Sequence, residues 1–409
     1  MDQAQQAPPR QALTFNATRG PFARLLLVNS LLSLLTLGIY RFWAKTNIRR
    51  YFWRNVSFLD DPLEYTGTGG ELFVGFLIVI AVLFPLGLVY GAINTLVPPQ
   101  HPEMHIALEV AYYTVLFALL QIGFYRMWRY RMSRTRWRGV RFGLDGSTWA
   151  YLRLAAGWTV LTVLTLGAAY PWMQIDLWRY QMHHTRLGDQ AFRFEGDAGK
   201  LFLAWAPVFA AILIHASIAV WGILEFGVGE QVRIDSLDIE QRDAVAIVGG
   251  LSIFTIVIAF FGFMFYRVRQ ARLQISGLRF GDAVFRSRLP FWWLFLIGTV
   301  CIVVILAIFA VLLGVFAPSL IGNGAHFRYG VTDPATITDL FGFIAAMFVT
   351  VVLIVPFIWT LVFRFEVARQ LVRTTAIDNP QVLEQAAQAE GESPRTGEGL
   401  ADALDIGGF

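Results

Sequence analysis

The sequence predicts an all-α membrane protein that crosses the bilayer several times. Of its 409 residues, 56% are hydrophobic and only 15% are charged, and the mean hydropathy is +0.54. Soluble domains carry about 25% charged residues, so a soluble core of this length could not cover so much apolar surface. The apolar residues also lie in long blocks, several of which reach the ~20 residues that a helix needs to cross a ~30 Å hydrocarbon core.

Eight apolar blocks follow one another along the chain, and two are weaker than the rest. The first and fourth blocks are the shortest, contain several Ser, Thr or Asn, and have a glycine near the end, Gly38 and Gly167. Their composition favours helices that enter the membrane without crossing it. The eight blocks are 25–40, 72–97, 106–125, 154–171, 201–224, 244–266, 291–317 and 337–363.

Basic residues determine the predicted topology. If the first and fourth blocks enter and leave on the same face, five segments with 25 Lys and Arg share one side, and the opposite loops hold only Arg233, Arg242 and Arg328. Such a bias marks the cytoplasmic side. We therefore predict six spanning helices in three hairpins, two re-entrant or interfacial helices packed against the bundle, and both termini in the cytoplasm. Eight full spans remain an alternative. The basic segments are 41–54, 126–141, 179–200, 267–288 and 364–373.

An internal repeat is the clearest pattern in the sequence. The run Thr36-Leu37-Gly38 returns as Thr165-Leu166-Gly167, and further residues match at the same offset of 129 without a gap. This self-similarity indicates duplication of a membrane unit. The other matches include Trp43 with Trp172, Arg50-Tyr51 with Arg179-Tyr180, Asp60 with Asp189, and Leu72-Phe73 with Leu201-Phe202.

The repeat and the basic helix ends divide the chain into units. We predict a polar N-terminal tail over 1–14, membrane repeat units over 15–141 and 142–279, a partial third unit over 280–375 without the Thr-Leu-Gly block, and an acidic tail over 376–409. Because the acidic tail has little to bury, we expect it to be disordered or to form a loose helix.

Two further segments follow each Thr-Leu-Gly block. The basic aromatic stretch YRFWAKTNIRRYFW of the first unit predicts a helix that lies in the interface, with Arg and Lys at the phosphates and the rings anchored below. The alternating segment SFLDDPLEYTGTG comes next, and its turn residues and aromatic side chains are typical of strands. We therefore expect small strand-like hairpins on the cytoplasmic side.

The motifs LLSLLTLGIYRFWAKTNIRRYFW and LEYTGTGGELFVGF carry a family resemblance. The sequence resembles the YjgN-type family of bacterial inner-membrane proteins, a domain of unknown function. The likeness is close in the first unit, recognisable in the second and thin beyond residue 280. It implies a multispan fold in the inner membrane and brings no activity, substrate or catalytic residue. The second unit departs from the motif at Gly199-Lys200, where the first has Gly70-Glu71.

His215 is the candidate for a polar site inside the membrane. It lies in the middle of AAILIHASIAV, and an ionisable group at that depth is costly and by default functional. A neutral imidazole bonded to a neighbouring helix is the alternative. Glu71 begins a helix after Thr-Gly-Thr-Gly-Gly, where a carboxylate can also serve as a simple cap. The other candidate motif positions are Gly38, Tyr40, Trp43, Gly167 and Trp172.

Arginine pairs mark the inner ends of the spanning hairpins. Tyr125-Arg126, Tyr266-Arg267 and Phe363-Arg364 each end an apolar block and have another Arg five residues on. Five residues turn a helix by ~140°, so the two guanidinium groups splay apart and can reach different phosphates. The alternative is that these charges only set the topology of the helices, which would be a sufficient reason for them. We predict contact with anionic lipid headgroups through Arg49, Arg50, Arg126, Arg131, Arg179, Arg267, Arg272, Arg364 and Arg369.

Two functions compete. Duplication, re-entrant segments, the intramembrane His215 and prolines within the spans (Pro85, Pro207, Pro356) favour transport or permeation of a small solute or lipid through the bundle. The alternative is a non-catalytic membrane organiser that binds anionic lipid or partner proteins through its basic aromatic belts.

Other function classes have little support in the sequence. No pair of catalytic groups converges, so no enzyme is predicted. The sequence has no Walker loop and no zinc-ligand motif, so neither a cofactor nor a metal is expected. The arginine clusters are tied to membrane edges, which argues against a nucleic-acid partner.

Overall fold

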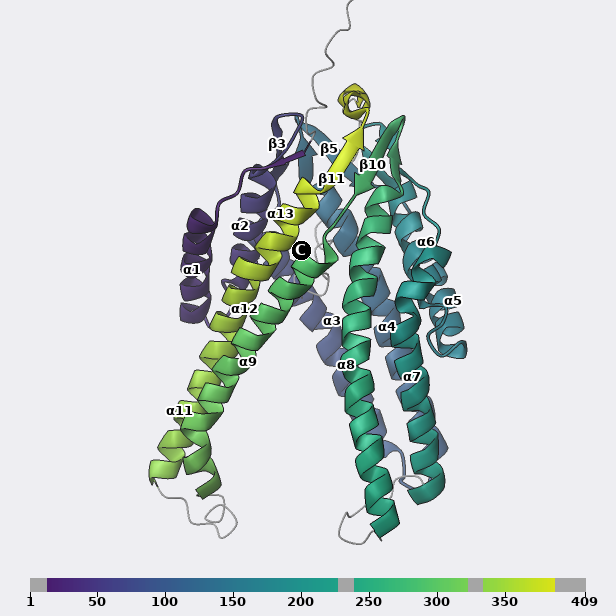
Figure 1. Ribbon diagram of the computed structural model, residues 1–409, viewed down its shortest axis with the longest axis vertical. Helices are drawn as coiled ribbons and strands as arrows, with labels where there is room; N and C mark the ends of the chain where they lie inside the picture. Colours follow the sequence, from purple (N-terminus) through teal and green to yellow (C-terminus); the bar gives the residue numbers. More distant parts are fainter. Residues whose placement is uncertain (1–12, 227–238, 323–333, 387–409) are drawn as a thin grey trace, which may run out of the picture.

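The computed structural model describes residues 13–226, 239–322 and 334–386. Long helices extend from a cap of short strands and spread apart toward their far ends (Figure 1). Within the described residues, six helices are long and apolar enough to cross a membrane. The predicted polytopic α-helical fold is confirmed. The helices form three hairpins: α3 (Gly69–Leu96) with α4 (Pro102–Ser133), α7 (Gly199–Phe226) with α8 (Ile239–Ser276), and α9 (Phe291–Gly322) with a last helix that runs from α11 (Pro334–Val349) to α13 (Phe365–Arg373).

The cap is an antiparallel meander, which confirms the predicted small strand hairpins. Strands that follow one another pair along β1 to β7 and along β8 to β11, and β1 contacts β11. Two of the turns use two residues with positive φ, Leu59-Asp60 and Arg138-Gly139, as tight hairpins require. The strands are β1 (Leu13–Phe15), β2 (Val56–Phe58), β3 (Asp61–Tyr65), β4 (Thr135–Trp137), β5 (Val140–Leu144), β6 (Thr185–Leu187), β7 (Gln190–Ala191), β8 (Arg193–Phe194), β9 (Leu278–Phe280), β10 (Ala283–Ser287) and β11 (Thr375–Asp378).

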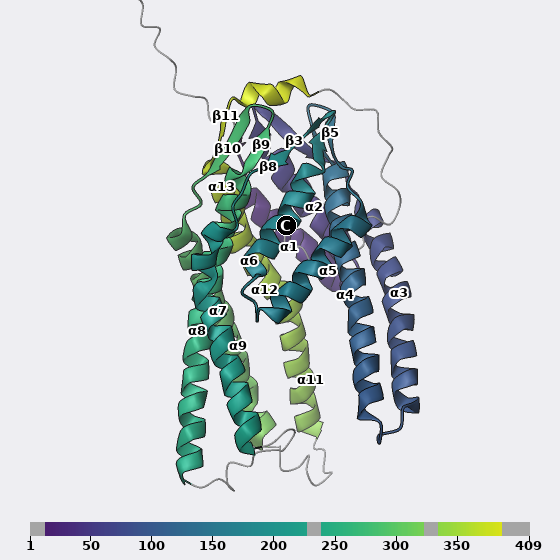
Figure 2. The ribbon, with the colours of Figure 1, turned by 90° about the vertical axis from the view of Figure 1, so that its right-hand side faces the viewer.

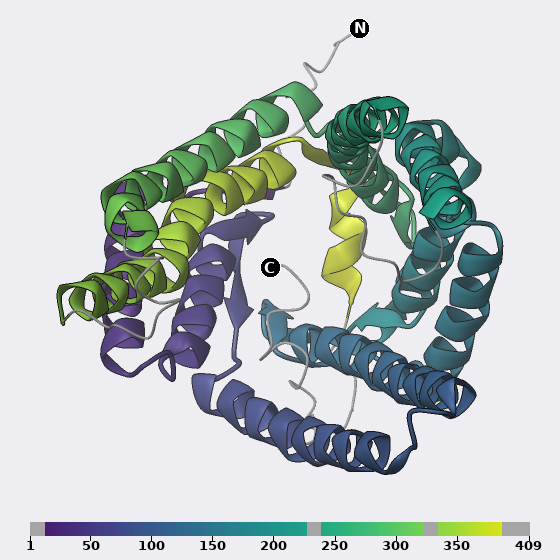
Figure 3. The same ribbon diagram turned by 90° about the horizontal axis from the view of Figure 1, so that it is seen from below.

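An apolar core fills the cap. Phe58, Trp137 and Phe280 come from three strands far apart in the sequence and are buried in one cluster. The short 3-10 helix η4 (Pro380–Gln385) adds Leu383 to this cluster. Seen from below, the helices form a ring and η4, in yellow, lies inside it (Figure 3). The cap therefore joins the ends of all the helical hairpins through one shared core.

The prediction of a disordered tail from residue 376 is wrong for residues 376–386. Ile377 lies opposite Phe285 in the β10–β11 pair, and Leu383 is buried in the cap. Arg138 donates to Glu384 at 2.8 Å and also to Asp61, and these hydrogen bonds raise the pKa of the Arg138 guanidinium. The composition of the tail does not reveal this structure, because a few apolar residues suffice to anchor a short strand and turn. Residues 387–409 lie outside the described residues.

Two helical hairpins leave the cap and return to it. α1 (Arg19–Leu35) and α2 (Arg41–Arg54) form the first, and α5 (Thr148–Leu164) and α6 (Tyr170–His183) form the second. The α5–α6 hairpin ends well short of the far ends of the long helices (Figure 2). The described residues therefore contain two short hairpins packed against the long helices, which agrees with two re-entrant or interfacial segments and not with eight full spans.

The Thr-Leu-Gly block forms the tip of each re-entrant hairpin. Leu37 and Gly38 have φ of 50° and 88°, and Leu166 and Gly167 have φ of 50° and 95°. Glycine adopts positive φ without the Cβ penalty, so it suits this chain reversal. The turn makes α2 and α6 the returning legs of the hairpins, and the expectation that the basic aromatic helix lies in the interface stays a prediction.

The order of elements repeats at the offset of 129 residues. α1 begins at Arg19 and α5 at Thr148, and α2 begins at Arg41 and α6 at Tyr170. The predicted borders after residues 141 and 279 fall inside β5 and β9, and the division into three units stays a prediction. β1 and β11 both lie in the cap, so the two described ends of the chain share one side of the spans (Figure 1).

Candidate functional site

Arginines hold the strand hairpins against the helix ends. α2, α4, α6, α8 and α13 each carry an arginine five residues before the cap residue that ends the helix. In α2 this is Arg50, which donates to the carbonyl of Gly67 at 2.8 Å, just before the next helix. The same bond joins Arg129 to Gly146, Arg179 to Gly196 and Arg272 to Leu289. In α13 the residue is Arg369, which lies 3.6 Å from Glu366.

The prediction of which arginines stand at equivalent helix ends is wrong for α4. Sequence spacing paired Arg131 with Arg272 and Arg369, but the ends of the helices show that Arg129 holds that place. Two residues turn a helix by ~200°, so Arg131 points to another side, where it is 7% exposed. The error arose because Arg occurs at several nearby positions in this helix.

The other predicted lipid-contact arginines differ in their surroundings. Arg49 is buried and donates to the Tyr65 hydroxyl at 3.3 Å, and Arg267 donates to Gln270 at 2.9 Å. Arg126 is exposed. Contact of these arginines with lipid headgroups stays a prediction.

The first pocket is the cavity between the first re-entrant hairpin and the last helix. Its volume is about 500 Å³. Leu26, Phe52 and Phe357 belong to its apolar wall. Its charged lining residues are all basic, and none of the described residues that line it is acidic. The basic residues are Arg41, Lys45, Arg49 and Arg364.

Three of these basic residues follow one face of α2. Arg41, Lys45 and Arg49 are four residues apart, a spacing that places side chains on the same side of a helix. Arg41 lies beside the hairpin tip, with its guanidinium over the rings of Phe42 and Phe76 at 4.9 and 5.0 Å from the centroids. Arg49 lies toward the cap. The row of positive charge therefore runs from the tip to the cap.

The tip beside the first pocket is apolar and uncovered. Leu35 is 78% exposed, Leu37 is 83% exposed and Ile39 is 52% exposed. Contiguous exposed apolar surface of this kind fits hydrocarbon or a partner better than water. The first pocket thus combines a basic face with a hydrocarbon-compatible edge.

One buried donor in the first pocket has no partner. The Asn29 side chain is 3% exposed, and its Oδ1 accepts a hydrogen bond from Asn47 Nδ2 at 3.2 Å. Its own Nδ2 has no hydrogen-bond partner. An unsatisfied buried donor costs ~1–3 kcal/mol. A ligand atom that accepts from Asn29 Nδ2 would remove that cost.

The last helix departs from α geometry where it lines the first pocket. Two π-helical segments, η2 (Thr350–Ile354) and η3 (Trp359–Arg364), flank α12 (Val355–Ile358). Val352 and Thr360 from these segments line the pocket. Because π-helical turns are rare and often occur at functional sites, they mark this wall as a candidate site.

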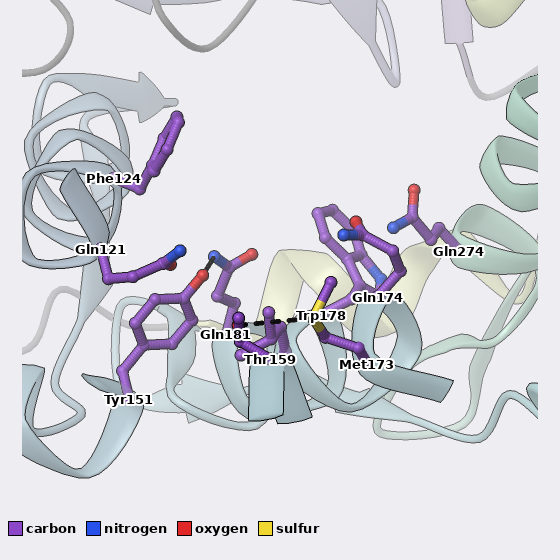
Figure 4. Close-up of a pocket in the computed structure, with 10 residues that line it drawn as sticks. Gln121, Phe124, Tyr151, Thr159, Met173, Gln174, Trp178, Gln181 and Gln274 are labelled. Atoms are coloured by element: carbon purple, nitrogen blue, oxygen red, sulfur yellow. Dashed lines mark hydrogen bonds between the residues drawn. The ribbon is translucent and has the colours of Figure 1, made fainter. Parts of the chain in front are cut away.

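The second pocket lies at the re-entrant hairpin α5–α6, against α4 and α8 (Figure 4). Its volume is about 260 Å³. None of the described residues that line it is charged. Its lining includes four glutamines, Gln121, Gln174, Gln181 and Gln274, and the aromatic residues Phe124, Tyr151 and Trp178.

The two pockets are built from equivalent positions. Arg364 and Phe124 each lie ten residues before the cap residue of their helices, Thr374 and Arg134. The residues equivalent to the four basic residues of the first pocket lie in or beside the second pocket and are all neutral. At the offset of 129, Arg41 corresponds to Tyr170, Lys45 to Gln174, Arg49 to Trp178, Ser30 to Thr159, Ala44 to Met173, Ile48 to Leu177 and Phe52 to Gln181.

The aromatic motif positions pack the hairpins against the long helices. Tyr40 and Trp43 stack with their centroids 6.1 Å apart. Trp43 also closes over Gly69, where an added Cβ would lie 2.6 Å from its ring. Trp172 packs on Phe202 at 5.4 Å between centroids. These contacts are structural, and a further role for the motif positions stays a prediction.

Glu71 caps α3 and fastens it to α4. The Glu71 N–H donates to Thr68 Oγ1 at 3.3 Å, and the Glu71 carboxylate accepts from the Thr68 N–H at 3.2 Å. The Tyr130 hydroxyl donates to the same carboxylate at 2.7 Å, and Arg134 forms an ion pair with it. Glu71 thus acts as a helix cap, as the alternative interpretation held, and its carboxylate also binds the second helix α4.

His215 is held by its own helix. Its Nδ1 lies 2.7 Å from the Ala211 carbonyl, and its Nε2 is buried without a hydrogen-bond partner. His215 lines neither the first nor the second pocket. A functional role for it stays a prediction.

Sequence reasoning missed three residues that give the first pocket its polar chemistry. Arg41 and Lys45 stand four residues apart with Arg49, and this spacing was a usable signal. Asn29 gave no signal, because its surroundings come from helices distant in the sequence.

Comparison with known proteins decides the family. A family described as bacterial protein of unknown function (DUF898) matches residues 10–403. The chain belongs to this family. Proteins named inner membrane protein YjgN are similar to it, which confirms the YjgN-type resemblance and supports an inner-membrane location.

The matching relatives come from Salmonella typhimurium and two strains of Escherichia coli. The protein of Salmonella typhimurium is 30% identical over 161 residues, which are 39% of this chain and 36% of the relative. That of Escherichia coli O157:H7 is 30% identical over 139 residues, 34% and 32% of the two chains. That of Escherichia coli K12 is 25% identical over 162 residues, 40% and 38%. The chain thus spans about a third of the length of the curated relatives it matches. No solved structure matches.

Proposed function

We propose that the protein transports a small amphiphilic solute or lipid, or lets it permeate, along its re-entrant hairpins. The observation that carries this proposal is the equivalent pocket at each hairpin, between a returning helix and a long spanning helix. Transporter sites form where repeats meet and helices are broken at membrane depth. Irregular backbone at that depth is tolerated where it is covered by protein or lines a cavity.

An amphiphile fits this geometry better than a fully polar solute. Moving a polar headgroup through hydrocarbon is costly unless polar groups accompany it. The polar residues of α2 can accompany a headgroup from the cap toward the exposed tip, while the apolar chains stay in the bilayer. We further propose that the cap faces the cytoplasm, because the basic residues cluster there.

Lipid exchange in vesicles tests the proposed function. Purified protein in liposomes is expected to speed the movement of a fluorescent short-chain lipid between leaflets, measured by dithionite quenching. Replacing the equivalent residues Ser30 and Thr159 by Trp fills the two pockets and should slow exchange. Leu88→Trp, at a 58% exposed site on α3, is the matched control. Exchange no faster than in protein-free vesicles would contradict the proposal.

A non-transporting organiser is the competing function. It relies on basic belts at the helix ends, but Arg50, Arg179 and Arg272 already donate to backbone carbonyls. Lipid binding without faster exchange would favour the organiser over transport.

A further inference from the structure

We infer that the first pocket binds the phosphate-bearing headgroup of an anionic amphiphile. The assignment deepens the proposed function, on which its part in transport rests, while binding itself can be measured without any flux. The second pocket has no such affinity.

Charge is the first argument. Arg41, Lys45 and Arg49 stand in a row on α2, and Arg364 lines the pocket from the last helix. No described residue that lines the pocket is acidic, so an anionic ligand meets only positive or neutral groups there. Arginine presents a planar fork of donors that matches phosphate oxygens, and lysine binds phosphate as a point charge. This set of residues selects a phosphate group over a neutral or cationic one.

Asn29 is the second argument. Its Nδ2 is buried, has no hydrogen-bond partner and belongs to a residue that lines the pocket. Asn47 donates to the Asn29 Oδ1, which leaves Nδ2 as the group that can meet a ligand. A donor needs an acceptor, and the oxygens of a phosphate are acceptors. The unpaired amide therefore points to the same ligand chemistry as the basic row.

The shape of the pocket requires an apolar part of the ligand. Phe348, Val352 and Phe357 form the wall opposite α2, and the pocket extends to Leu37 at the uncovered tip. A cavity of about 500 Å³ is in the range of sites that bind small organic molecules. Inorganic phosphate would leave this wall unfilled, whereas an acyl or similar chain would cover it.

The second pocket is an internal reference. It has the same place on a re-entrant hairpin, yet Gln174 and Trp178 stand where the first pocket has Lys45 and Arg49. Any affinity for phosphate that came from the hairpin fold alone would be shared by both pockets. Affinity that comes from the basic row belongs to the first pocket only.

Binding of short-chain lipids to the purified full chain tests the inference. The probes are dioctanoyl phosphatidic acid, dioctanoyl phosphatidylcholine and inorganic phosphate, titrated by calorimetry in a non-ionic detergent. Phosphatidic acid should bind tightest. Arg41→Gln with Lys45→Gln should weaken it at least about tenfold, since two charge-assisted contacts are lost. Asn29→Leu should weaken it about threefold to tenfold through loss of one donor. Gln174→Leu in the second pocket should leave it unchanged.

Several outcomes would overturn the inference. Equal phosphatidic acid affinity in the wild type and in the Arg41→Gln, Lys45→Gln variant, at the same unfolding temperature, removes the basic row from the site. If inorganic phosphate binds as tightly as the lipid, the ligand need not be an amphiphile. If phosphatidylcholine binds as tightly as phosphatidic acid, the pocket does not select an anionic ligand. Specific phosphatidic acid binding without leaflet exchange would leave this inference standing and end only the proposed transport.

Discussion

The first and second pockets share a scaffold and differ in charge. Each lies between a re-entrant hairpin and a long helix, and each hairpin reverses at a Thr-Leu-Gly turn with nearly the same φ angles. The equivalent arginines Arg50 and Arg179 hold both strand hairpins through backbone carbonyls. None of these contacts uses the residues that give a pocket its charge. The fold of a hairpin and the chemistry of its pocket can therefore change independently.

The hairpins also differ in how they are fastened at the cap. Arg19, at the start of α1, lies 3.1 Å from Glu366 of the last helix, and this carboxylate also accepts from Trp293 at 3.0 Å and Gln370 at 2.7 Å. At the equivalent places of the second hairpin stand Thr148 and Arg126, which cannot form such a pair. A buried carboxylate thus ties the first hairpin to its pocket wall, and the second does without one.

Removing the Glu366 charge should have the largest effect on stability. The Glu366 side chain is 1% exposed, and breaking a buried ion pair by removing one partner costs ~3–5 kcal/mol. We expect Glu366→Gln to lie near the lower end, about 3 kcal/mol, because Arg19 is 55% exposed. Hydrogen exchange should show the loosening in Arg19–Leu35 and not in Thr148–Leu164. Arg126→Gln is the control, and a surface change of this kind should stay within about 0.5 kcal/mol. Equal loosening of both hairpins would show that Glu366 supports the whole cap.

Arg50→Gln and Arg179→Gln should destabilise the protein by similar amounts. Each loses a charge-assisted hydrogen bond to a carbonyl, worth ~1.5–3 kcal/mol. Arg179 also pairs with Asp176, but that pair is partly exposed and should add at most ~1 kcal/mol. Thermal unfolding in detergent measures both variants. If Arg50→Gln instead lowers lipid affinity and leaves stability unchanged, the lipid-contact role predicted from the sequence holds for this residue.

Patterns along the sequence were the predictable part of the fold. The lengths of the apolar blocks, the Arg bias and the offset between Gly38 and Gly167 can each be read from the sequence without knowing which helices pack together. The re-entrant hairpins followed from these patterns because a block of about 16 residues is short of the ~20 that a span needs. The interfacial position expected for α2 stays a prediction, because an amphipathic pattern does not record the direction in which a turn sends the helix.

The pockets could not be predicted, because their walls come from distant parts of the chain. Arg364 and Val352 lie more than 300 residues after the α2 residues that face them. The basic row of Arg41, Lys45 and Arg49 was visible, but it was attributed to the interface. Similarly, the role of Arg129 depends on the position of the cap, which spacing between arginines alone does not give.

Adding a positive charge to the second pocket should give this pocket affinity for phosphatidic acid. In a chain that carries Arg41→Gln and Lys45→Gln, the first pocket is weakened and Gln174→Lys places a charge at the position equivalent to Lys45. One new lysine contact to a phosphate, worth ~1.4 kcal/mol, corresponds to about tenfold tighter binding of dioctanoyl phosphatidic acid. Gln174→Leu is the neutral control for the change in size. No gain with Lys would mean that the difference between the pockets lies in their shape and not in their charge.

The hairpin tips should give the smallest difference. Gly38→Ala places a Cβ in open space, so its cost is the positive φ alone, about 1 kcal/mol. Gly167→Ala has the same backbone cost, but its Cβ would lie 3.2 Å from Ile212 Cδ1, which must shift slightly. Thermal unfolding should therefore rank Gly167→Ala at or just below Gly38→Ala in stability.

The lipid affinity of Gly38→Ala then separates the contribution of the turn to binding from the contribution of the basic residues. The added methyl group contacts no protein atom, but Leu37 and Gly38 line the first pocket, so a change in phosphatidic acid binding beyond about twofold, ~0.4 kcal/mol, would come from the tip, through its backbone or through the methyl group itself. That result would show that the tip, and not the basic residues alone, sets the affinity of the first pocket. Because the second hairpin has the same conformation, it would then need another reason for its lack of affinity. Unchanged affinity would leave the basic residues as the difference between two pockets built on one turn.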